Sequence, residues 1–156
     1  MLFAHARGRL APQDYHRFHS PVDGVVGKYV PVANGYLTVN PMAIREKDVD
    51  VFTENKRMVT VIQSPEFDKV GYIIVGAMLV GSIHITSPRG SKVKRLDEVG
   101  YFAFGGSTII VLFRKGAIVL DQDLVDTSRK QVETLVRVGN SIGHTPDASP
   151  ATRPVN

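Results

Sequence analysis

The 156-residue sequence contains no cysteine, which excludes disulfides, thiolate zinc sites and thiol catalysis. Long apolar runs are also missing. The stretches around residues 70–85 and 109–113 are broken by glycine or too short for the roughly 20 residues of a membrane-spanning helix. The first ten residues carry Arg7 and Arg9 after only a few apolar residues, so they lack the apolar run of a secretory signal. Any membrane contact is therefore expected to be peripheral.

The composition is that of one ordinary globular domain, with 43% apolar and 22% charged residues. Lysine and arginine number 19 against 15 acidic residues, and the formal net charge of +4 favours an anionic surface such as acidic lipid. No arginine-rich run is interleaved with stacking aromatic residues, so a nucleic-acid partner is not expected.

Short β-branched runs alternate with glycine, proline and asparagine about every eight to twelve residues, which predicts a mainly β fold of antiparallel strands in a sandwich or barrel. The expected strands are Val22–Val32, Tyr36–Val39, Met58–Gln63, Val70–Val75, Met78–Ile85, Gly100–Phe104, Ile109–Phe113 and Ala117–Leu120.

The apolar period changes between Asp121 and Gly143, where six apolar residues fit one face of a helix. This pattern predicts one C-terminal helix packed on a sheet, and so an α+β class dominated by strands. The final residues 144–156 are rich in proline, serine, threonine and alanine, which is typical of a disordered tail.

Two apolar runs meet at Gly105-Gly106-Ser107-Thr108. Glycine leaves the Gly106 carbonyl unshielded, so the Ser107 hydroxyl can attack the peptide bond immediately before it, which would be self-cleavage. A Gly-Gly-Ser sequence between strands is also the usual composition of a hairpin turn. The chemical interpretation needs a base from elsewhere in the chain.

The segment DYHRFH, residues 14–19, places Asp14, His16 and His19 within six residues. Both histidines can titrate near neutral pH and act as general acids or bases. In an extended chain Asp14 and His16 share one face and His19 takes the other, whereas in a helical turn the two histidines share a face. Asp14 capping a turn, structural histidines and a metal pair are the alternatives, although two histidines without a third ligand argue against zinc.

The charged segment over residues 45–57 ends in Glu54-Asn55-Lys56-Arg57. A solvated connection is one interpretation of this composition. The other is that Lys56 and Arg57 present cations to a substrate carboxylate or phosphate, for which the arginine fork is well suited.

Taken together, the two motifs make the chain resemble the pyruvoyl-dependent phosphatidylserine decarboxylase family. The matching segments are LAPQDYHRFHSP (10–21), Asp23-Gly24, YLTVNPMAI (36–44), DVFTENKR (50–57), VGAMLVGSI (75–83), GYFAFGGSTIIVLF (100–113) and ETLVRVG (133–139). The cleavage motif of the family often has leucine where this chain has Gly105.

The resemblance implies that Ser107 attacks the Gly106 carbonyl and that the amide rearranges to an ester. Elimination and hydrolysis then leave a pyruvoyl cofactor at the new amino terminus, which gives a β chain of residues 1–106 and an α chain of residues 107–156 that stay together. The pyruvoyl group would bind the substrate amine and accept the electrons released as carbon dioxide leaves.

The family's Asp-His-Ser triad aligns with His19 and Ser107, while His16 and Asp14 align with residues that assist processing or decarboxylation. The resemblance places the triad aspartate well upstream of Asp14, so residues 1–143 would correspond to the family's C-terminal portion. Because a histidine without its orienting carboxylate loses much of its strength as a base, self-processing is the step to test.

The implied reaction converts phosphatidylserine in a membrane surface to phosphatidylethanolamine, and a homodimer is left open. One alternative is a pyruvoyl-dependent decarboxylase of aromatic amino acids. Another is an inactive β-domain binding module, because the Ser-Pro-Val-Asp-Gly turn at residues 20–24 also resembles lipoyl-like domains.

Overall fold

A computed structural model describes residues 3–11, 13–32, 35, 54–76, 82–103 and 107–148. The strand expected at Tyr36–Val39 lies outside the described residues, as do the glycine pair Gly105 and Gly106 and most of the expected cationic loop.

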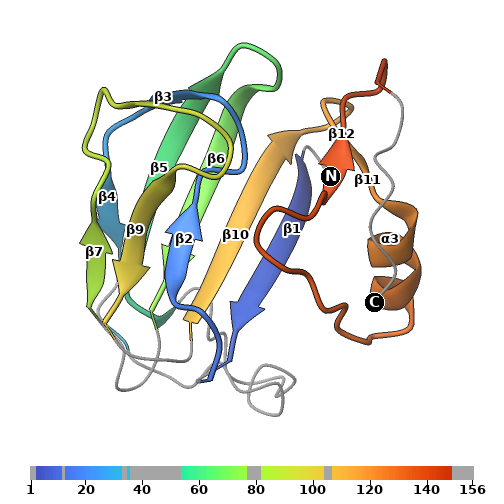
Figure 1. Cartoon of the computed structure of the whole chain (residues 1–156), viewed down its shortest axis with the longest axis horizontal. Coiled ribbons are helices and arrows are strands. Elements are labelled where there is room, and N and C mark those ends of the chain that lie inside the picture. Colours follow the sequence, from blue (N-terminus) through green and yellow to red (C-terminus); the bar gives the residue numbers. More distant parts are fainter. Residues whose placement is uncertain are drawn as a thin grey trace.

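The larger sheet has seven strands in the order β1-β10-β6-β5-β3-β8, with β4 also paired to β5, and every pairing in it is antiparallel. Figure 1 shows β10 running between β1 and β6. The strands are β1 (Phe3–Leu10), β3 (Gly24–Val26), β4 (Val30–Val32), β5 (Arg57–Ser64), β6 (Asp68–Val75), β8 (Lys92–Val93) and β10 (Ser107–Arg114).

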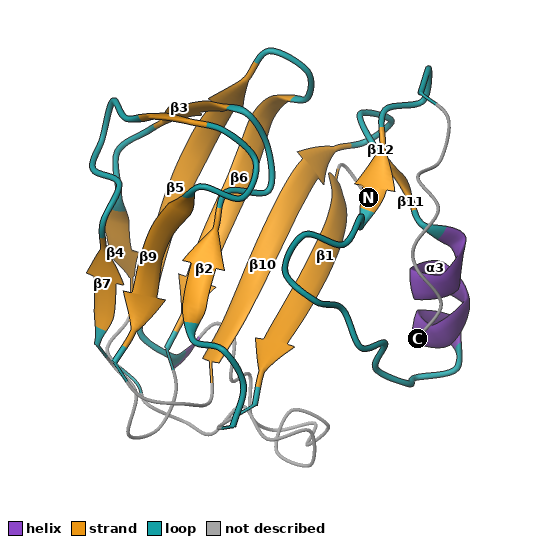
Figure 2. Ribbon diagram, in the orientation of Figure 1, coloured by secondary structure: helices purple, strands orange, loops and turns teal. Residues whose placement is uncertain are grey.

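A second sheet has three strands in the order β2-β9-β7 (Figure 2), and a two-stranded sheet joins β11 to β12. These strands are β2 (Arg17–His19), β7 (Ile83–Ile85), β9 (Glu98–Phe102), β11 (Val119–Leu120) and β12 (Gly143–His144). Gly100 lies in the middle of β9, where a Cβ atom would collide with the His84 carbonyl and the Phe18 ring. Glycine therefore allows β2, β9 and β7 to approach closely.

The core lies between the two larger sheets. Phe18 of β2 packs edge to face against Phe102 of β9, with ring centroids 5.1 Å apart, and against Tyr72 of β6 at 6.3 Å. Val111 and Phe113 of β10 belong to the same buried cluster. Because side chains from both sheets form one apolar interior, the expected antiparallel sandwich is confirmed.

The sequence located most strands but missed β1, β8 and β12 and left β2 open. The expected run Val22–Val32 divides into β3 and β4. β1 is an edge strand of small and basic residues with an alternating pattern of exposure, so it has little of the β-branched signal. The segment around β2 is extended rather than helical, with Phe18 buried.

The predicted C-terminal helix is present, but it is shorter than its apolar pattern indicated: α3 spans only Gln122–Arg129, and none of its residues is buried. Gln131 takes a positive φ of 59°, and the N–H groups of Gln131 and Val132 bond back to the carbonyls of Ser128 and Thr127. This bonding pattern is a Schellman cap, which ends a helix. The apolar residues beyond it, from Val132 to Val138, are exposed, so their helical spacing reflects no buried helix face.

His144, the first residue of the expected tail, pairs with Val119 in the β11–β12 sheet. The described residues continue to Ala148. No helix among the described residues combines the length and the apolar character needed to cross a membrane.

Candidate active site

Ser107 is the first residue of β10 and is fully buried, with no exposed surface. Its main chain pairs with Leu10 at the end of β1, and the next residue, Thr108, pairs with Val75 of β6. The side-chain oxygens of both Ser107 and Thr108 are buried and have no hydrogen-bond partner among the described residues. A buried hydroxyl without a partner destabilises the fold, and such groups point to a functional role.

The Ser107 hydroxyl faces the interior between the two sheets. Side chains alternate along a strand, so Ser107 shares a face of β10 with Val111 and Phe113, which belong to the core. That face looks toward the three-stranded sheet, because Tyr72, which pairs with Val111, contacts Phe18 of β2. The three-stranded sheet is also the one that carries the DYHRFH segment.

Several predicted site residues gather at the end of the sandwich where β10 begins (Figure 1). β1 and β9 finish at this end, and β2 starts there. The His16 carbonyl accepts a 2.9 Å hydrogen bond from the N–H of Phe102, the last residue of β9. Phe102 and Ser107 are only five positions apart in the sequence, so their Cα atoms lie within about 18 Å of each other.

His16 presents a second unpartnered polar atom at this end. Its Nε2 atom is buried and has no hydrogen-bond partner among the residues that the structure describes. An imidazole nitrogen in this state is available to a group that enters the site. His16 is therefore the histidine that the structure places at the Ser107 end of the sandwich.

His19 lies farther from the Ser107 end than His16 does, and both of its ring nitrogens have hydrogen-bond partners. Nδ1 is 2.7 Å from the Leu96 carbonyl oxygen, and Nε2 is 2.9 Å from the Tyr15 hydroxyl. The His19 carbonyl accepts a 2.9 Å hydrogen bond from Tyr72, and burial raises the pKa of that phenol. Since Tyr72 pairs with Val111, His19 is level with the middle of β10, and the structure does not bring it to Ser107.

Asp14 closes a turn just after β1. Its carboxylate accepts the Ala11 N–H at 2.7 Å, and its own N–H donates to the Ala11 carbonyl at 2.9 Å. This is the turn-capping role that the sequence left as an alternative. The turn holds the chain between Leu10, opposite Ser107, and His16.

Lys56 and Arg57 lie at the same end of the large sheet as Ser107. Arg57 pairs with Val75, which in turn pairs with Thr108. Two strand spacings, about 10 Å, therefore separate the Arg57 and Thr108 backbones. The Arg57 guanidinium also donates to the Asn55 carbonyl at 3.2 Å.

Two residues of the site region were not singled out from the sequence. Asn55 is fully buried, and its amide donates to the Gly76 carbonyl at 2.9 Å. This bond joins the residues just before β5 to the residue just after β6, next to Val75, which pairs with Thr108. Leu96, the partner of His19, has a positive φ of 72°. An asparagine next to a charged loop only weakly indicates a buried structural residue. A leucine gives no indication of a left-handed backbone, because residues with a side chain rarely adopt one.

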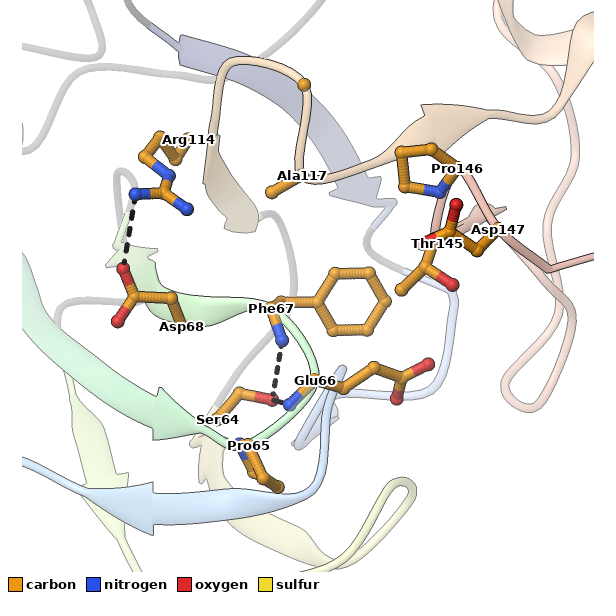
Figure 3. Close-up of a pocket in the computed structure, with 11 residues that line it drawn as sticks. Ser64, Pro65, Glu66, Phe67, Asp68, Arg114, Ala117, Thr145, Pro146 and Asp147 are labelled. Carbon is orange, nitrogen blue, oxygen red and sulfur yellow. Dashed lines mark hydrogen bonds and ion pairs between the residues drawn. The ribbon is translucent and has the colours of Figure 1, made fainter.

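The described residues also form a pocket of about 480 Å³ at the opposite end of β10, lined by the β5–β6 turn, Arg114, and Thr145–Asp147 (Figure 3). The eight residues of β10 put Arg114 about 23 Å from Ser107. Two polar side chains of this pocket have partners in its wall: Ser64 accepts the N–H groups of Glu66 and Phe67, and Asp68 lies 3.8 Å from Arg114. No group of three potential metal ligands occurs in the part of the chain that is described.

The chain matches the family model described as phosphatidylserine decarboxylase over residues 4–144. It is 55% identical to phosphatidylserine decarboxylase proenzyme 2 of Komagataella phaffii, covering 89% of this chain and 14% of that protein. Identity to the proenzyme 2 of Saccharomyces cerevisiae is 52%, covering 93% and 13%. The proenzyme of Chlamydia muridarum is 51% identical, covering 88% and 46%.

The chain thus spans less than half the length of each of these relatives. The matched region includes DYHRFH, the charged segment and the strand that begins at Ser107. On this evidence the chain belongs to the phosphatidylserine decarboxylase family.

Proposed function

We propose that this chain is the part of a phosphatidylserine decarboxylase that creates its own pyruvoyl group at Ser107 and converts phosphatidylserine to phosphatidylethanolamine. The observation that carries the proposal is the Ser107 hydroxyl, which is buried, unpartnered among the described residues, and located at the first position of a strand. The relatives are named as proenzymes, which agrees with activation by cleavage.

In the proposed self-cleavage, Ser107 Oγ attacks the Gly106 carbonyl carbon, and the C–N bond breaks as the C–O bond forms. A base takes the hydroxyl proton, and the released nitrogen gains one. Elimination across Cα and Cβ of residue 107 frees the Gly106 carboxylate. Water then replaces the nitrogen of residue 107, which leaves as ammonia. The buried position of Ser107 suits these steps because solvent would otherwise hydrolyse the ester early.

The two histidines are proposed to have different tasks. A histidine that donates through Nδ1 and accepts a hydroxyl proton at Nε2 has the arrangement of a triad base, and His19 has these bonds to Leu96 and Tyr15. Because His19 does not reach Ser107 in this structure, its ring must leave the Tyr15 hydroxyl and move to the Ser107 end of β10 to serve as that base. His16, whose Nε2 is unpartnered among the described residues, would move the proton during decarboxylation.

The pyruvoyl group would supply the electron sink for loss of carbon dioxide. Residue 107 is a suitable place for it, because Oγ faces the interior and the amino terminus produced by cleavage would lie beside Leu10. Lys56 and Arg57 are proposed to bind the carboxylate or phosphate of the substrate, with Asp14 shaping the turn before His16. A basic protein meeting an anionic lipid at a membrane surface fits the net charge of +4.

The two products of cleavage are expected to stay together. β10 would belong to residues 107–156, yet it pairs along its whole length with β1 and along Thr108–Leu112 with β6, both of which precede the cut. Separating the fragments would break the middle of the large sheet.

An intact-mass spectrum under denaturing conditions tests the proposal. Two species, residues 1–106 and residues 107–156 with a blocked amino terminus, are expected, while a native spectrum should show one particle containing both. Carbon dioxide release is then compared on phosphatidylserine vesicles and on tryptophan, and a preference for tryptophan would indicate the amino-acid decarboxylase instead. A single 17.1 kDa species with no release from either substrate would contradict the proposal and favour a binding module.

A further inference from the structure

The His19 ring is held by a main-chain carbonyl rather than by a carboxylate. The 2.7 Å contact joins Nδ1 of His19 to the carbonyl oxygen of Leu96. A carbonyl oxygen can only accept, so Nδ1 must carry the proton. In the neutral ring Nε2 is then the basic nitrogen, and the Tyr15 hydroxyl at 2.9 Å donates to it.

The Leu96 carbonyl is directed by a left-handed backbone. Leu96 has φ of 72°, a left-handed conformation that is unfavourable for a residue with a side chain. The side chain itself is 52% exposed, so its burial does not account for this conformation. Other contacts must therefore hold the turn.

Hydrogen bonds on both sides provide that support. Within the turn, the Lys94 N–H donates to the Asp97 carboxylate at 2.8 Å, and the Asp97 N–H donates to the Lys94 carbonyl at 3.1 Å. Across to the residue after His19, the Leu96 N–H donates to the Ser20 carbonyl at 3.0 Å, and the Ser20 N–H donates to the Asp97 carbonyl at 2.8 Å. The turn and the histidine are thus fixed to each other through adjacent backbone atoms.

We infer that the Lys94–Asp97 turn is a positioning device that presets the tautomer of His19, with Leu96 supplying the orienting acceptor and Asp97 closing the turn. The acceptor role is one that a triad normally gives to a carboxylate. A neutral imidazole in water favours the opposite tautomer, with the proton on Nε2, so the turn must impose the one seen here. The inference about tautomer stands on geometry alone; its effect on cleavage rests on the proposed function.

The chain offers a matched control. Asn140 closes a turn with the same two bonds, accepting the Arg137 N–H at 2.9 Å through its side chain and donating its own N–H to the Arg137 carbonyl at 3.0 Å. None of the hydrogen bonds of that turn involves His19. Replacing Asp97 or Asn140 with alanine therefore removes the same type of bond in two places, of which only one supports the histidine.

Long-range proton–nitrogen NMR of the ¹⁵N-labelled chain, at a pH where the ring is neutral, measures the tautomer directly, with His19 assigned through His19→Gln. We expect Nδ1–H in the unmodified chain and in Asn140→Ala. Asp97→Ala should shift the ring signals toward the Nε2–H form. Tyr15→Phe should retain Nδ1–H, since that hydroxyl binds the other nitrogen. Leu96→Gly keeps every hydrogen-bonding group and removes the side chain that makes a positive φ unfavourable, so it should also retain Nδ1–H.

The rate of cleavage before Ser107 is the second readout. Loss of an orienting partner should slow cleavage by about 10- to 100-fold in Asp97→Ala and leave Asn140→Ala unchanged. An Nε2–H tautomer in the unmodified chain, or equal signals in Asp97→Ala and Asn140→Ala, would overturn the inference while leaving the proposed function intact. The expected tautomers in a chain that never cleaves would support the inference and count against the proposed function.

Discussion

The two ends of β10 differ in how their polar groups are satisfied. At the Ser107 end, the Oγ atoms of Ser107 and Thr108 and Nε2 of His16 are buried without partners among the described residues. At the Arg114 end, Ser64 and Asp68 have partners around an open pocket. The pocket is the more obvious feature of the surface, yet Ser64 and Asp68 in its wall already have partners.

This difference supports the proposed site at the Ser107 end. Unpaired buried polar groups lower stability, and a catalytic role is one of the explanations for their being retained. Paired groups around a turn need no such explanation. The predictions below change one end at a time, with the matching change at the other end as the control.

The largest effect is expected from Ser107→Ala. Without the hydroxyl no ester can form, so cleavage should be lost completely, whereas Arg114→Ala at the far end of the strand should cleave at the normal rate. Removing an unpartnered buried hydroxyl relieves a cost, so the melting temperature of Ser107→Ala should not fall. Intact mass and thermal unfolding by circular dichroism measure the two quantities. Residual cleavage at the same bond would contradict the role of Ser107.

The second-largest effect is expected from His16→Gln. Loss of a general acid or base at the Ser107 end should lower carbon dioxide release by about 100-fold or more. His84→Gln is the control, because His84 stacks on Tyr101 with ring centroids 4.7 Å apart in an exposed part of β7. Steady-state release from phosphatidylserine vesicles is the measurement. An equal loss in both variants would mean that the effect comes from the sheet and not from the site.

The sequence predicted the strands that have β-branched runs and the segments that meet at the site. It placed Ser107 in the connection just before the strand expected at Ile109–Phe113, whereas the structure makes Ser107 the first residue of β10. It did not resolve the separation of His16 from His19, because three residues of β2 with a register shift between Phe18 and His19 decide which way each ring points. The helix was overextended because apolar spacing alone does not reveal the cap at Gln131.

Contacts between distant segments were beyond the sequence as well. The Leu96 carbonyl reaches His19 across 77 positions of the chain, and the turn that directs it contains no glycine to signal a left-handed residue. Asn55 similarly bonds to Gly76 across 21 positions. Such pairs depend on how the sheets pack, which local patterns do not encode.

Asn55→Ala should produce a moderate loss of stability. The buried amide that ties β5 to β6 would be gone and the Gly76 carbonyl would lose its donor, so unfolding should become easier by about 1–3 kcal/mol. Ser64→Ala is the control at the other end, where the two accepted bonds are long at 3.3 Å and a smaller loss, about 0.5–1.5 kcal/mol, is expected. Urea unfolding of both variants in the Ser107→Ala background keeps cleavage from affecting the comparison. A larger loss of unfolding free energy in Ser64→Ala than in Asn55→Ala would contradict the expectation that the Asn55 bond contributes more to stability.

The smallest effect is expected from Asp68→Asn, which weakens the pair with Arg114. The two side chains are 49% and 70% exposed and lie 3.8 Å apart, so solvent and salt screen their attraction. The free energy of unfolding should change by less than about 0.5 kcal/mol, and cleavage before Ser107 should proceed at the normal rate. Urea unfolding at low and high salt, with intact mass followed over time, checks both expectations. A slower cleavage would show that the Arg114 end influences the chemistry along the length of β10, and the contrast between the two ends would then no longer hold.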